Sequence, residues 1–211
     1  MPSLFSYCVP SDSGRAPNPF WSVCTLVICK PPIRRKAEVG DWIVGTGSKN
    51  ARCGDMSGKV VYIMEVTKKI RMAAYDALTR ESLPEKIPDW HSADPRRKVG
   101  DSIYDFTSGS PVLRKGVRVH ATAKLRQRDL RGEYALLSEH FWYFGNRAVP
   151  LPPELMELVQ QRQGFKRPSI QHLLAPFLEW VTGLGLAPNR LYGKPQAWRH
   201  SRACPDECSP T

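Results

Sequence analysis

The sequence of 211 residues contains no long hydrophobic run. No apolar stretch approaches the roughly 20 residues that a membrane-spanning helix needs, and the first residues, Met1–Phe5, lack the basic region and cleavage site of a signal peptide. We therefore expect neither a membrane protein nor a secreted one, and a cytoplasmic location. Acidic residues are scarce: 20 Asp and Glu face 31 Lys and Arg, which leaves a formal charge of +11. This excess favours a polyanionic partner such as nucleic acid.

The six cysteines form no disulfide or metal framework. Four stand among apolar or turn residues, where a small, buried and reduced thiol is usual: Cys8, Cys24, Cys29 and Cys53. The other two share an H-x3-C-x3-C spacing with a histidine of the polar tail: His200, Cys204 and Cys208. Zinc normally takes four ligands and no fourth stands nearby, so we predict no metal and no cofactor.

The sequence also lacks the common nucleotide-binding and catalytic motifs. Gly45–Asn50 misses the third glycine of the dinucleotide fingerprint, and Gly54–Val60 has three residues between its glycines where a P-loop has four. The G-x-S-x-G motif of serine hydrolases and the paired motifs of zinc deaminases are absent. No set of nucleophile, base and orienting residue can be assembled. If the protein is an enzyme, Asp101 and Glu139 are the candidate catalytic groups.

The first two thirds of the chain predict short β-strands divided by turns. Runs of β-branched and aromatic residues favour strands, which we expect at Leu4–Val9, Trp21–Cys29, Trp42–Gly45, Lys59–Val66, Ile103–Phe106, 112–119, Glu133–Leu137 and Phe141–Gly145. Good helix formers predict one helix at Met72–Thr79. The proline-containing, charged segment Glu81–Gly100 predicts a surface loop.

After residue 150 the pattern becomes helical. Pro152-Pro153-Glu154 favours a helix start, and apolar residues at helical spacing from Ile170 to Val181 predict a second helix. Pro176 lies within this stripe and should kink or divide that helix. We predict an α+β protein with a partly open β-barrel (1–150), a C-terminal helical cap (151–186) and a basic, flexible tail (187–211). A parallel α/β sheet fits less well because it needs a helix between most strands.

Aromatic rings beside polar turns suggest a surface that recognises a base. Rings stack on a flat base while amides and hydroxyls read its edge, although core packing more often explains any single ring. The candidate base-binding residues are Asn18, Phe20, Trp21, Trp42, Thr46, Ser48, Tyr104, Ser138, Phe141 and Tyr143. The candidate phosphate-binding residues, which would hold the backbone without reading its sequence, are Lys30, Arg34, Arg35, Lys36 and Lys49.

Two segments resemble the PUA-like superfamily, which includes the EVE, ASCH and YTH domains. They are Gly40–Gly47 (GDWIVGTG) and Val60–Val66 (VVYIMEV). More closely, the order of motifs from about Leu4 to Leu155 resembles the second nucleotide-modification-associated domain family. These motifs are APNPF at 16–20, the segment 25–34, Gly40–Gly47, GDSIY at 100–104 and LLSEHFWYFG at 136–145.

The resemblance implies a bacterial or phage protein that is associated with modified nucleotides. Together with the charge, it predicts an EVE/ASCH-like barrel that binds a modified or flipped base in nucleic acid, with DNA favoured and no membrane partner. One alternative is an enzyme of nucleotide or base hypermodification. Another is a protein-interaction adaptor whose basic charge is incidental. The choice among DNA, RNA and a free nucleotide stays open from the sequence, as does the oligomeric state.

Overall fold

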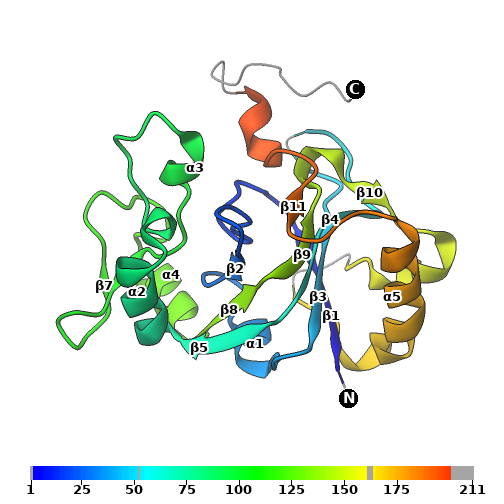
Figure 1. Ribbon diagram of the computed structural model, residues 1–211, viewed down its shortest axis with the longest axis horizontal. Coiled ribbons are helices and arrows are strands. Elements are labelled where there is room, and N and C mark those ends of the chain that lie inside the picture. Colours follow the sequence, from blue (N-terminus) through cyan, green and yellow to red (C-terminus); the bar gives the residue numbers. More distant parts are fainter. Residues whose placement is uncertain (1, 52, 161–163, 201–211) are drawn as a thin grey trace.

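The computed structural model describes residues 2–51, 53–160 and 164–200 (Figure 1). Its largest element is a six-stranded mixed sheet in the order β1-β3-β4-β9-β11, with β10 added to β4. The pairs β1/β3 and β9/β11 are parallel, whereas β3/β4, β4/β9 and β4/β10 are antiparallel. The strands are β1 (Leu4–Val9), β3 (Trp42–Gly47), β4 (Lys59–Glu65), β9 (His140–Tyr143), β10 (Val149–Pro150) and β11 (Arg190–Leu191).

A three-stranded sheet continues from the large one. It consists of β2 (Cys24–Leu26), β8 (Tyr134–Ser138) and β5 (Lys68–Arg71), while β6 (Tyr104–Asp105) and β7 (Val112–Leu113) form a separate ribbon. Strand β8 leads into β9 after one residue, Glu139, so the chain passes directly from one sheet to the other. The predicted α+β class is confirmed. No closure of the strands into a barrel is found within the part of the chain that the structure describes.

The helices lie at both ends of the sheets. Figure 1 shows α5 on one side of the large sheet, and α2, α3 and α4 at the other end of the molecule. The α-helices are α1 (Pro31–Lys36), α2 (Met72–Glu81), α3 (Pro95–Lys98), α4 (Ala123–Leu130) and α5 (Leu174–Gly183). The 3-10 helices are η1 (Pro84–Lys86), η2 (Gly145–Arg147), η3 (Pro153–Leu158), η4 (Pro168–Leu173) and η5 (Gln196–His200). No described helix has both the length and the apolar character that a membrane crossing requires.

The C-terminal helices cover one face of the large sheet. Alternate residues of β3 and β9, such as Trp42 and Trp142, point toward this face because side chains of a strand alternate in direction. They pack with Ile170, Phe177 and Val181 in one buried apolar cluster. Pro176 is the third residue of α5, and the chain before it is the 3-10 helix η4, so the predicted helical stripe is divided in two.

The described part of the predicted tail packs on the body instead of lying loose. Strand β11 pairs with β9, and the ring of Trp198 stacks on Phe20 with 5.5 Å between centroids. Gln196 is buried and donates from its side chain to the Gly145 carbonyl at 3.2 Å. Apolar and polar contacts therefore hold residues 190–198 in place. Cys204, Cys208 and the side chain of His200 lie outside the described residues.

Candidate functional site

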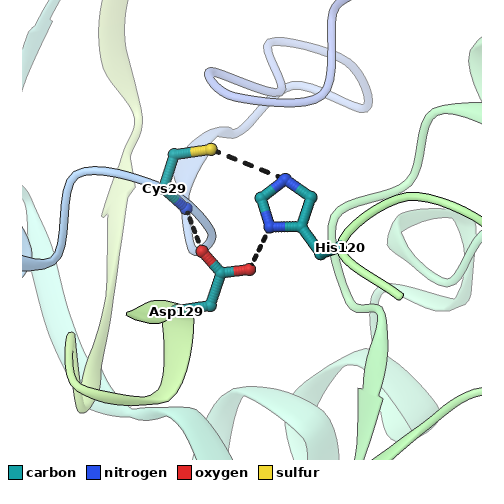
Figure 2. Close-up of side chains that lie close together, drawn as sticks. All are labelled: Cys29, His120 and Asp129. Atoms are coloured by element: carbon teal, nitrogen blue, oxygen red, sulfur yellow. Dashed lines mark hydrogen bonds and ion pairs between the residues drawn. The ribbon is translucent and has the colours of Figure 1, made fainter. Parts of the chain in front are cut away.

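A thiol, an imidazole and a carboxylate from three separate segments meet beside α4 (Figure 2). Cys29 lies in the loop between β2 and α1, His120 in the loop before α4, and Asp129 in the last turn of α4. The Cys29 Sγ is 3.7 Å from His120 Nε2, and His120 Nδ1 forms a hydrogen bond with Asp129 Oδ2. The three side chains thus form a continuous Cys–His–Asp relay, which we call the Cys29 triad.

The loops that carry the Cys29 triad have unusual backbone conformations. Cys29, Lys30 and His120 have φ angles of +60°, +42° and +56°. Non-glycine residues rarely adopt this left-handed conformation, and they do so preferentially at functional sites. Pro31 and Pro32, which favour a helix start, begin α1 immediately after this turn. The turn therefore presents Cys29 at the point where the chain changes from strand to helix.

Asp129 is held by groups on every side. Its Oδ1 accepts from the Cys29 backbone N–H at 2.8 Å, and its Oδ2 also accepts from the Tyr104 hydroxyl at 3.1 Å. Its side chain is fully buried, whereas the His120 side chain is 15% exposed. The carboxylate can therefore orient the imidazole from inside, while the thiol edge of the site stays reachable from solvent.

A buried arginine joins the backbones of Cys29 and Asp129. Arg34 is fully buried and donates to the carbonyls of Cys29 (2.8 Å) and Tyr134 (2.9 Å), and also to the carbonyl of Asp129. Gly132 leaves room for this guanidinium, because a Cβ at that position would lie 2.1 Å from Arg34 Cζ. The two segments that carry Cys29 and Asp129 are thus fixed relative to each other.

The electrostatics of the Cys29 triad favour a charged imidazole. The hydrogen bond to Asp129, and then the contact with Cys29, raise the pKa of His120 from 6.5 to about 9. Burial and the Asp129 carboxylate raise the pKa of the Tyr104 hydroxyl well above its usual value, so it donates as a neutral phenol. A charged imidazole next to a thiol is one of the electropositive surroundings in which reactive cysteines occur.

The same three residues could be considered as metal ligands, since their ligand atoms all lie within 4.8 Å of one another. The geometry argues against a shared ion. The thiol faces Nε2 of His120 and the carboxylate faces Nδ1, and these nitrogens point away from each other across the ring. Ligands of one metal must converge on one point. The arrangement is that of a nucleophile, a base and an orienting carboxylate.

A second buried polar cluster surrounds Asp101, one of the two predicted catalytic groups. Asp101 accepts from Thr25 Oγ1 at 2.5 Å and from the Tyr75 hydroxyl at 2.6 Å, and burial raises its pKa. Lys86 is also fully buried and donates to Asn18 Oδ1 at 2.7 Å and to the Val23 carbonyl at 2.6 Å.

Burial lowers the pKa of Lys86 to about 8, although the Asp101 carboxylate acts in the opposite direction. The predicted surface loop Glu81–Gly100 therefore differs from the observed structure at this point, because η1 places Lys86 in the interior. Glu139, the other predicted catalytic group, is exposed. Asp101 is enclosed by donors of the protein itself, which is the environment of a structural carboxyl group.

Most of the predicted base-binding residues are buried, and they do not gather at one place. Trp42 belongs to the cluster beneath α5, Phe141 and Tyr143 to the cluster on the opposite face of the sheet, and Tyr104 to a third. Trp21 and Ser48 are partly exposed. The others are buried: Asn18, Phe20, Thr46 and Ser138. Of all these residues, Tyr104 is the one whose hydrogen bonding links it to the Cys29 triad.

The predicted phosphate-binding residues divide by exposure. Arg35, Lys36 and Lys49 are exposed. Lys30 is partly buried, and its ammonium donates to the Cys8 carbonyl at 3.2 Å and lies 4.3 Å from the centroid of the Tyr7 ring. Arg34 offers no exposed guanidinium to a phosphate, because its donors are taken by protein carbonyls.

Comparison with known families now places the chain. The model of nucleotide modification associated domain 2 matches residues 1–202, almost the whole sequence. The chain belongs to this family. The match includes the C-terminal segment that the sequence motifs left uncovered, and it contains all three residues of the Cys29 triad. No curated protein and no solved structure matches the chain. Membership of the family associates this protein with nucleotide modification.

Sequence reasoning missed the Cys29 triad of this family member. Cys29 is 91 residues from His120 and 100 from Asp129, so no local motif joins them. His120 follows the predicted strand 112–119 and belongs to no recognisable motif, and Cys29 was expected to be a packing thiol. One signal was present: in the run Cys29-Lys30-Pro31-Pro32 a single residue separates the cysteine from a helix-starting proline pair.

Proposed function

We propose that this family member is a cysteine-dependent enzyme of nucleotide modification that transfers an acyl group to or from a nucleotide substrate. The observation that carries the proposal is the position of His120 between the Cys29 thiol and the Asp129 carboxylate. In such a relay the imidazole takes up and returns protons while the carboxylate fixes its orientation. Family membership supports a nucleotide substrate, and the geometry of the Cys29 triad supports this class of reaction.

The proposed reaction has two steps. In the first, the Cys29 sulfur attacks the carbonyl carbon of an amide or ester, R–CO–X, and His120 delivers a proton to X as the C–X bond breaks. The products are a Cys29 thioester and HX. In the second, water or another nucleophile, H–Y, attacks the thioester with His120 as base. This step forms R–CO–Y and restores the thiol, so no oxidant or reductant is required.

A small activated ester tests this chemistry without knowledge of the natural substrate. With 4-nitrophenyl acetate we expect a rapid release of one 4-nitrophenolate per protein, and mass spectrometry should find an acetyl group on Cys29. Cys29→Ser and His120→Gln should remove the burst, whereas Cys53→Ser should retain it. A burst that persists in Cys29→Ser would overturn the proposal.

The base-reading function predicted from the sequence is the second candidate. The observation that favours it is at Trp21, a partly exposed ring with the guanidinium of Arg96 4.7 Å from its centroid. A stacked aromatic ring and guanidinium can continue onto an extruded base. A PUA-like arrangement of the strands belongs to this candidate. Absence of the acetyl burst, combined with binding of a modified oligonucleotide that Trp21→Ala weakens, would favour this candidate over the enzyme.

A further inference from the structure

Exposed cations lie on the two helices next to the Cys29 triad, α1 and α4. Helix α4, which contains Asp129, exposes Lys124, Arg126 and Arg128, and its only carboxylate is the buried Asp129. Helix α1, which follows Cys29, exposes Arg35 and Lys36. The two helices contact each other. We call these five residues, together with Lys30, the basic rim.

Among the described residues, the cations of the basic rim have no ion-pair partner, in contrast to Lys69 and Arg71 of the neighbouring strand β5. On β5, Lys69 pairs with Glu38 at 2.7 Å and Arg71 pairs with Glu133 at 2.6 Å. Within the described chain no carboxylate lies within 4.0 Å of a charged nitrogen of the basic rim. Adjacent like charges without counterions oppose folding. A group of such cations beside the Cys29 triad is a surface that attracts an anionic ligand.

The extent of the basic rim exceeds what one phosphate group needs. Lys124 and Arg128 are four residues apart and share one face of α4, about 6 Å apart along the helix axis. Arg35 and Lys36 add charge on a second helix. A free nucleotide brings its phosphates at a single position, whereas a polynucleotide brings one at each residue of the strand. The several separated cations of the basic rim therefore match a polynucleotide better than a free nucleotide.

We propose that the Cys29 triad acts on a base within a nucleic-acid strand, and that the basic rim holds the phosphates on either side of that base. This inference rests on the proposed function for the reaction itself. The Cys29 thiol is only partly exposed, so the target base must leave its stack to reach the thiol, as it can in a single strand or after flipping from a duplex. The phosphate contacts position the strand without reading its sequence.

Two measurements with a single-stranded oligonucleotide test this inference. In the first, alkylation of Cys29 by iodoacetamide is followed by peptide mass spectrometry. We expect the oligonucleotide to slow it at least about fivefold, and thymidine monophosphate at equal phosphate concentration to leave it unchanged. In the second, the salt dependence of oligonucleotide binding is measured. The slope of log K against log[salt] is negative for such binding. The double variant Lys124→Gln, Arg128→Gln should make it shallower by about 1.4, since each lost single-strand phosphate contact contributes roughly 0.7.

The matched control removes the same charge elsewhere. Arg190 and Lys194 are exposed on the C-terminal segment beside β9, and their double glutamine variant should keep both the slope and the protection of Cys29. Equal protection by thymidine monophosphate, or an unchanged slope in the α4 variant, would overturn the inference. Absence of the acetyl burst from the wild-type protein is a separate result that overturns the proposed function. A burst without protection by the strand would overturn this inference alone.

Discussion

The two ends of the molecule bury different kinds of side chain. Under α5 the interior is apolar, with Trp42, Trp142 and Phe177 at its centre. Between β2, α2 and α4 the interior also holds ionisable groups: Arg34, Lys86, Asp101 and Asp129. Burying a charge costs several kcal/mol unless it is paired and hydrogen-bonded. We call the region under α5 the capped end and the region between β2, α2 and α4 the triad end. The capped end is therefore built for stability, while the triad end retains groups that stability alone does not favour.

The comparison also separates what each end contributes to function. The Cys29 triad and its supporting residues Arg34 and Tyr104 all belong to the triad end. The capped end supplies a sheet that holds β2 and β8 in place through the continuous strands β4–β5 and β8–β9. Substitutions at the two ends should accordingly differ in kind. The following predictions test that difference, beginning with the largest expected effect.

Removal of a ring at the capped end should cost stability and leave the chemistry intact. Phe177 is fully buried, and its ring packs edge-on against Trp42 with 6.3 Å between centroids. Phe177→Ala should lower the free energy of unfolding in urea by about 3–5 kcal/mol, from lost burial and the cavity left behind. The folded fraction should retain the acetyl burst.

Leu191 provides the control for this substitution because it is 42% exposed. Leu191→Ala should change the free energy of unfolding by less than about 0.5 kcal/mol. A similarly small change in Phe177→Ala would show that α5 is not packed on the sheet as described.

Removal of the His120 imidazole at the triad end should lower the free energy of unfolding by an amount that depends on pH. The folded protein binds the His120 proton more tightly than the unfolded chain does, since the pKa rises from 6.5 to about 9. The resulting stabilisation is complete below about pH 6.5 and is lost as the pH rises through 9. The difference in unfolding free energy between wild type and His120→Gln should therefore shrink by up to about 3 kcal/mol over this range.

Phe177→Ala serves as the control for the pH series. The loss of unfolding free energy in Phe177→Ala comes from apolar contacts, so it should stay constant over the same pH range. If the His120→Gln deficit were equally constant, the hydrogen bond between His120 and Asp129 would not hold the imidazole in its charged form.

The sequence predicted much of the capped end. The runs of β-branched and aromatic residues in β1, β3 and β4 and the helical spacing from Ile170 to Val181 reflect burial of apolar side chains, and the structure confirms the elements at those positions. Helix α1 was not predicted, because Lys30-Pro31-Pro32 was interpreted as the end of the strand Trp21–Cys29. Helix α4, with the sequence AKLRQRDL, has too few apolar residues to show a periodic stripe.

The triad end was harder to predict because tertiary contacts determine its chemistry. Lys86 was placed in a surface loop, since a lone lysine gives no sign of the oxygen acceptors that surround it when buried. Cys29 and Tyr104 were each assigned to other roles, packing and base stacking. Their relation to Asp129 depends on three chain segments meeting, and no spacing in the sequence encodes that meeting. Family resemblance was recognised correctly, but it supplied no catalytic residue.

The central claim is that His120 and Asp129 activate Cys29, and the rate of thiol alkylation tests it most directly. Cys53 is also partly exposed, so it is an internal reference in the same protein. At pH 6.5, iodoacetamide should modify Cys29 at least about tenfold faster than Cys53, equivalent to about 1.4 kcal/mol. His120→Gln should abolish this advantage and Asp129→Asn should reduce it. Equal rates at Cys29 and Cys53 in the wild type, or an advantage unchanged in His120→Gln, would contradict the account.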